Sequence, residues 1–116
     1  MRVTFDPLSS AHSMDTSFNS NAQILDYSLG YSIQGIITGS PVGTIKLQGS
    51  NDPVPADLSG ATVANWTDIV DSAQSVTGAG SVMWNYNGSF YKWVRVVYTA
   101  STGSGSITLN LMGKGF

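Results

Sequence analysis

Hydrophobic and polar residues alternate along this chain in short segments, with no stripes of helical spacing. In Gly43–Gln48, Ile45 and Leu47 fall on one side and polar residues on the other. Ser106–Gly113 repeats this pattern with three aliphatic residues on one face. A period of two is typical of a β-strand with one buried face.

Turn-forming residues (Gly, Pro, Asn, Asp and Ser) recur about every 8–12 residues, a spacing typical of an all-β sandwich or barrel. The segments between them are rich in Val, Ile, Thr, Tyr and Trp, which favour strands. We therefore predict an antiparallel all-β domain spanning residues 1–116. The expected strands are Val3–Phe5, Ala22–Tyr27, Tyr31–Thr38, Gly43–Gln48, Trp66–Val70, Gln74–Val76, Ser81–Tyr86, Tyr91–Ala100 and Ser106–Gly113.

The strand Tyr91–Ala100 carries bulky residues on both faces. Such a strand is expected at the centre of a sheet, covered on one side by the facing sheet. Either a neighbouring subunit or a folded-over loop could cover its other side. Val94, Val96 and Tyr98 lie on one face of this strand, and Trp93, Arg95 and Val97 lie on the other. Arg95, the one charged residue among these bulky side chains, needs a carboxylate partner or an exit to solvent. We predict Arg95 and Trp93 as subunit or partner contacts.

Two polar segments are expected to be loops. Ser50–Asn65 contains Pro53 and Pro55, which exclude a central strand. Ser9–Asn21 is polar and irregular, so residues 1–21 are predicted as a short strand followed by an extended arm that orders against a partner.

Charged residues make up 10% of the chain, against about 25% in typical proteins. The formal net charge of −2 favours neither nucleic acid nor acidic membranes as partners. The absence of cysteine excludes disulfides, thiolate zinc sites and thiol nucleophiles. No apolar run is long enough for a membrane helix, and the N-terminus does not resemble a signal peptide.

No motif in the sequence predicts catalysis. The single histidine, His12, lies in a polar segment and is expected at the surface. The chain has no G-x-S-x-G elbow and no phosphate-binding glycine loop. We expect neither enzymatic activity nor a cofactor.

Aspartates offer one further kind of site. Asp68 and Asp71 lie three residues apart, and Asp52 and Asp57 could form an oxygen cage for calcium with Asn51. Aspartate at a turn more often bonds its own backbone. We therefore predict no metal site.

Aromatic residues are concentrated in the second half of the chain, each within an expected strand pattern. Core packing is the favoured interpretation, because each ring buries a large apolar area. An exposed row of rings would instead indicate stacking on sugars. The residues are Trp66, Trp84, Trp93, Tyr86, Tyr91 and Tyr98.

Residues 43–116 resemble a family of small structural proteins of tailed bacteriophages. The matching phrases are GTIKLQGSNDP, NWTDIV and YKWVRVVYTASTGSGSITLNLMGKG, in this order. A more distant similarity is to discoidin-type domains, which share the first two phrases and a Tyr-Val-Arg-Val strand. Both resemblances imply an antiparallel β-sandwich of jelly-roll type with about eight strands.

The phage resemblance implies a virion component made in the host cytoplasm, such as a capsid decoration or cement protein. Such a protein would self-associate, with a trimer favoured, and bind other virion proteins such as the major capsid protein. Ser9–Asn21 would then serve as an arm, and Phe116 would anchor the tail Gly113–Phe116. The alternative is a carbohydrate-binding or adhesive sandwich on a phage tail or cell surface.

Overall fold

The computed structural model describes residues 2–25, 30–53, 63–87 and 91–115, and these form strands and connecting turns without a helix. The prediction of an all-β fold is therefore confirmed. The strands are β1 (Arg2–Ser13), β2 (Phe18–Asn19), β3 (Gln23–Ile24), β4 (Gly30–Gly39), β5 (Val42–Ser50), β6 (Thr67–Asp68), β7 (Gln74–Thr77), β8 (Gly80–Asn87), β9 (Trp93–Thr102) and β10 (Gly105–Gly115).

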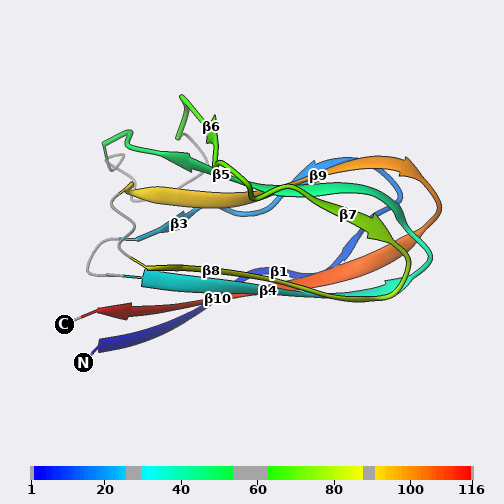
Figure 1. Cartoon of the computed structure of the whole chain (residues 1–116), viewed down its shortest axis with the longest axis horizontal. Coiled ribbons are helices and arrows are strands. Elements are labelled where there is room, and N and C mark those ends of the chain that lie inside the picture. Colours follow the sequence, from blue (N-terminus) through cyan, green and yellow to red (C-terminus); the bar gives the residue numbers. More distant parts are fainter. Residues whose placement is uncertain (1, 26–29, 54–62, 88–90, 116) are drawn as a thin grey trace.

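The strands form two antiparallel sheets that pack face to face (Figure 1). The first sheet has the order β1-β10-β4-β8, and the second has the order β2-β9-β5-β6. β3 continues the edge formed by β2, since both pair with β9, and β7 continues the edge formed by β6, since both pair with β5. The ten strands thus occupy eight positions, four in each sheet.

The pairing of these positions is nested along the chain. β1 pairs with β10, β2 and β3 with β9, β4 with β8, and β5 with β6 and β7. A long hairpin of four antiparallel pairs, rolled into two sheets, has this connectivity, which defines the jelly roll. The predicted jelly-roll sandwich of about eight strands is confirmed.

The N-terminal segment differs from the prediction. β1 runs to Ser13, and β2 follows at Phe18–Asn19, where a polar loop or arm was expected. Leu8 and Met14 are buried, so this segment belongs to the sandwich. Two register shifts in the β1–β10 ladder interrupt the alternation of side chains, and this hides the strand from a search for a period of two.

Two other expected strands are shorter than predicted. Of Ala22–Tyr27 only Gln23–Ile24 is a strand, and residues 26 and 27 lie outside the described residues. Trp66–Val70 reduces to Thr67–Asp68, because the chain turns at Asp71, which has a φ of 62°. The remaining expected strands are confirmed to within a few residues at each end.

The core lies between the sheets and contains one face of each central strand. β9 contributes Val94, Val96 and Tyr98, which are fully buried and form one of the two bulky faces of this strand. β10 contributes the three aliphatic residues of its alternating pattern. Each buried aliphatic or aromatic side chain stabilises the fold by about 1.5–3 kcal/mol.

Tight turns join the strands at one end of the sandwich. Gly39 is the last residue of β4 and has a φ of 86°, and Gly103 lies between β9 and β10 with a φ of 81°. A Cβ at Gly103 would lie 2.1 Å from the carbonyl oxygen of Ser40. Only glycine fits this turn, because it combines a left-handed backbone with close approach of another chain segment.

Candidate functional site

Arg95 is the centre of a polar network on the outer face of the second sheet. β5 places Gln48 opposite Arg95 on β9 and opposite Asp68 on β6. The Nε and Nη2 atoms of Arg95 donate to Gln48 Oε1 at 2.9 and 2.7 Å. Gln48 Nε2 donates in turn to Asp68 Oδ1 at 2.9 Å.

The network ends in an ion pair at the surface. Lys46 Nζ lies 2.9 Å from Asp68 Oδ2. Hydrogen bonds from Gln48 and Lys46 lower the pKa of the Asp68 carboxyl, and the bond from Gln48 has the larger effect. Each of its two oxygens accepts a hydrogen bond from a protein donor, so Asp68 closes the network at the surface.

Trp66 covers the guanidinium of Arg95, whose Cζ lies 4.4 Å from the ring centroid. This cation–π contact and partial burial remove water from Arg95, and burial lowers its pKa. Trp66 directly precedes β6, so a residue between strands covers Arg95 here, and cover by a neighbouring subunit stays a prediction. Gln48, Asp68 and Trp66 were not identified from the sequence as partners of Arg95, since only the strand register brings them together.

Trp93 is 2% exposed and donates from Nε1 to the carbonyl oxygen of Asp52 at 3.0 Å. It therefore anchors the segment after β5 and has almost no surface to offer a partner. Arg95 remains partly exposed, and its contact with a partner stays a prediction. Phe116 lies outside the described residues.

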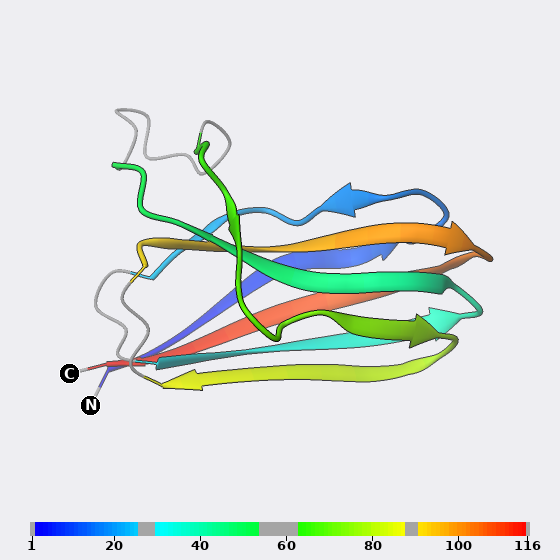
Figure 2. The ribbon, with the colours of Figure 1, turned by 45° about the horizontal axis from the view of Figure 1, so that its top comes forward.

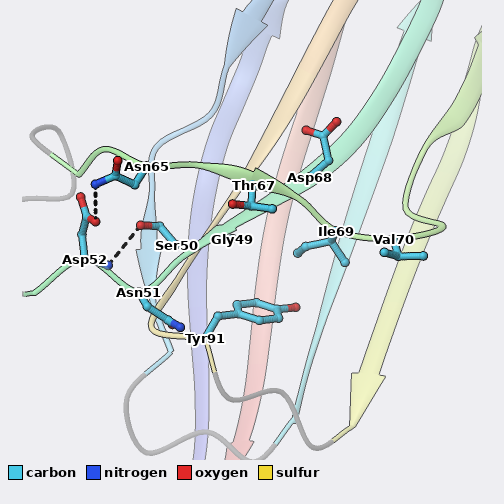
Figure 3. Close-up of a pocket in the computed structure, with 10 residues that line it drawn as sticks. All are labelled: Gly49, Ser50, Asn51, Asp52, Asn65, Thr67, Asp68, Ile69, Val70 and Tyr91. Atoms are coloured by element: carbon cyan, nitrogen blue, oxygen red, sulfur yellow. Dashed lines mark hydrogen bonds between the residues drawn. The ribbon is translucent and has the colours of Figure 1, made fainter.

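A cleft of about 580 Å³ opens beside the end of β5 (Figure 3). The ring of Tyr91 lies against Gly49, where a Cβ would come within 3.1 Å of the ring. The tyrosine hydroxyl is hydrogen-bonded to that of Tyr31. The lining residues are Gly49, Ser50, Asn51, Asp52, Asn65, Thr67, Asp68, Ile69, Val70 and Tyr91.

Asp52 organises one wall of this cleft. Its carboxylate accepts hydrogen bonds from Ala64 N at 2.8 Å and from Asn65 Nδ2 at 3.0 Å (Figure 3 shows the second). Both hydrogen bonds lower the pKa of the Asp52 carboxyl, and the bond from Asn65 has the larger effect. The carboxylate joins chain segments on either side of residues 54–62. Its role in the structure is to hold this wall.

The structure gives no support to a metal site in the described residues. No group of three or more acidic or histidine side chains gathers within them. Asp52 and Asp68 are engaged by protein donors, and Asp57 lies outside the described ranges. His12 is exposed, as predicted, and stacks on Phe18 with ring centroids 3.9 Å apart.

Most of the aromatic rings pack inward. Trp84, Trp93 and Tyr98 are buried, and Tyr86 and Tyr91 pack against the core as partly buried residues. Burial raises the pKa of Tyr98. None of the large hydrophobic residues that are exposed in the described part of the chain is aromatic. The preference for core packing is confirmed for Trp84, Tyr98, Tyr86 and Tyr91. Trp93 is buried outside the core cluster, and the preference is wrong for Trp66, which is partly exposed over Arg95.

The outer face of the first sheet carries exposed apolar side chains. Ile36, Met83 and Met112 are 45%, 53% and 39% exposed on three adjacent strands. They lie among uncharged polar residues. Of the described side chains at outward positions of β4, β8 and β10, only Lys114 is charged, at the end of β10.

No known protein family profile matches this sequence, and no curated protein matches it. Similarity is found among solved structures. The SPBc2 prophage-derived protein YomS superposes with a TM-score of 0.58 at 11% identity, covering 97% of this chain and 94% of YomS. The jelly-roll sandwich is therefore shared with a prophage-derived protein.

Two further structures share the fold. PirA has a TM-score of 0.54 at 14% identity, over 92% of this chain and 90% of PirA. The CBM36-1 domain of a multidomain xylanase from the hindgut metagenome of Trinervitermes trinervoides has a TM-score of 0.50 at 8% identity, over 99% of both chains. At these identities the likeness establishes the fold alone.

Within the described residues there is no helix long and apolar enough to cross a membrane.

Proposed function

We propose that this chain is a non-enzymatic structural protein of a bacteriophage virion, which acts by self-association and by binding other virion proteins. The observation that carries the proposal is the outer face of the first sheet. It combines exposed Ile and Met side chains with uncharged polar residues over adjacent strands. Protein interfaces are depleted in charge at their centre and enriched in Met.

The origin of YomS in a prophage supports a phage context, and the sequence resemblance of residues 43–116 points the same way. Within this context the proposed role is capsid decoration or cementing of the shell, with the major capsid protein as partner and a trimer as the self-assembled unit. The virion is the proposed location.

The first test is the solution mass of the purified chain by light scattering, followed by binding to phage shells that lack the protein. A stable oligomer that binds such shells is the expected result. A strictly monomeric chain that binds no shell would contradict the proposal.

A second candidate function, carbohydrate binding, is favoured by the cleft beside Tyr91. Its lining combines a partly buried aromatic ring with Thr67 and the amide of Asn51, which suits the apolar faces and hydroxyls of a sugar. The shared fold with a CBM36-1 domain of a xylanase supports this candidate. A glycan array probed with the wild type and with a Tyr91→Ala variant tests it, because binding in this cleft requires the ring.

A further inference from the structure

The two sheets have four edges, and three of them are interrupted. β1 contains Pro7 and two register shifts. The edge formed by β2 and β3 is broken between Asn19 and Gln23, and the edge formed by β6 and β7 between Asp68 and Gln74. Breaks, bulges and proline are the devices that keep sheet edges from pairing with other chains.

β8, at the fourth edge, has none of these devices. It pairs with β4 without a register shift from Gly30↔Asn87 to Ile37↔Gly80. Its sequence, GSVMWNYN, contains neither proline nor a charged residue. Its eight residues exceed the mean strand length of about 5–6. In Figure 2 no other described strand lies on its far side, and the one hydrogen bond from β7 to its backbone is a long side-chain bond of 3.4 Å from Gln74 Nε2 to the carbonyl oxygen of Met83.

We infer that the open edge of β8 pairs antiparallel with β8 of a second copy of this chain. The inference rests on the self-association in the proposed function and names the contact that produces it. Two identical strands in antiparallel register are related by a twofold axis, so the contact closes on itself. The absence of charge in β8 lets the two strands pair without placing like charges opposite each other.

Pairing at this edge joins the two first sheets into one continuous sheet of eight strands. Val82, Trp84 and Tyr86 point toward the core of each copy, and Met83 and Asn85 lie on the outer face. The uncharged face that contains Ile36 and Met83 then extends across both copies. A twofold contact of this kind gives a dimer or, combined with a threefold contact elsewhere, a hexamer.

The test compares two double variants by light scattering. Met83→Lys/Asn85→Lys adds lysines to the edge strand, and places lysine opposite lysine whether the twofold axis lies at residue 83, 84 or 85. Val42→Lys/Thr44→Lys is the matched control. It also replaces an exposed apolar residue and an exposed polar residue two positions apart on one strand, but on β5 of the second sheet, away from β8 and from the outer face of the first sheet.

We expect a wild-type hexamer, in which β8 contacts join two of the proposed trimers, and we expect its mass to be halved by the edge variant and unchanged by the control variant. Circular dichroism and thermal melting establish that both variants are folded. Loss of the oligomer in both variants, or in neither, would overturn the β8 contact and leave self-association standing. A wild-type trimer would also overturn this contact alone, whereas a monomeric wild type would overturn both proposals.

Cysteine cross-linking gives an independent measurement, since the chain has no cysteine of its own. Directly opposite residues in an antiparallel pair have Cα atoms about 4.5–5.5 Å apart, within the range of about 4.4–6.8 Å that a disulfide requires. Single Cys variants are made at Ser81, Met83, Asn85 and Asn87, and each is oxidised alone and in pairwise mixtures. The variant or mixture whose cysteines lie opposite each other across the twofold axis should give a disulfide-linked dimer. Gln34→Cys should not, and a dimer formed only by this control would overturn the inference.

Discussion

The Oγ atom of Ser72 accepts a hydrogen bond from the backbone N of Leu47 at 3.0 Å. Ser72 is buried between β6 and β7, where the backbone N of Ile69 donates to the carbonyl oxygen of Leu47 but the ladders of β6 and β7 do not reach the amide of Leu47. Ser20 does the same on the other edge of the sheet, accepting from Val96 N at 2.8 Å. At both broken edges a serine hydroxyl thus replaces a missing backbone partner of a central strand.

Replacing Ser72 with alanine should lower the free energy of unfolding by about 1–3 kcal/mol, because the buried amide of Leu47 loses its acceptor. Urea denaturation followed by tryptophan fluorescence measures the change. Ser75→Ala, at an exposed position of β7, is the control and should change stability by less than about 0.5 kcal/mol. Equal effects of the two substitutions would contradict this role for Ser72.

Tyr98→Phe should leave stability unchanged or raise it by about 1 kcal/mol. The hydroxyl of Tyr98 is buried and has no hydrogen-bond partner among the described residues. Burying an unpaired hydroxyl costs free energy, and the substitution removes this cost. Tyr31→Phe is the comparison, because it removes a hydroxyl that bonds Tyr91, and it should destabilise the fold. Thermal melts of both variants measure the difference, and a marked loss of stability in Tyr98→Phe would contradict this prediction.

Asp52→Asn should make the stability of the protein less dependent on pH in the acid range. The pKa of Asp52 is lowered in the folded chain by donors from Asn65 and Ala64, against about 3.9 in an unfolded chain. Its carboxylate therefore stabilises the fold above about pH 4, and this contribution is lost as the pH falls through the lower folded pKa. Urea midpoints between pH 6 and pH 2 test the prediction, and an unchanged pH profile would refute it.

Gln48→Ala should destabilise the chain more than Lys46→Ala does. Gln48 is the acceptor for the partly buried guanidinium of Arg95, whose loss costs about 1–3 kcal/mol. Lys46 takes part in a solvent-exposed ion pair with Asp68, which contributes at most about 1 kcal/mol. Chemical denaturation at low and high salt distinguishes the two, since salt screens only the exposed pair. The opposite order of effects would contradict the importance of the Arg95 network.

The local pattern of the chain was enough to predict most of the strands. In β5 and β10 the alternation of aliphatic and polar residues marks both the strand and its buried face. The bulky run of β9 correctly indicated a central strand, and the structure shows that Val94, Val96 and Tyr98 form its inner face. These features are local, because a half-buried strand needs an apolar side chain at every second position.

The partners of individual residues were decided by the tertiary structure. Gln48 and Arg95 are far apart in the chain, and only the register of β5 with β9 places them opposite each other. The full length of β1 could not be found because register shifts interrupt its alternation, and β2 could not be found because it has only two residues. The buried serines leave no period in the sequence, since they act as side-chain acceptors. Whether β8 lies at an open edge depends on the order of strands in the sheet, which is set by long-range pairing and not by the sequence of β8 itself.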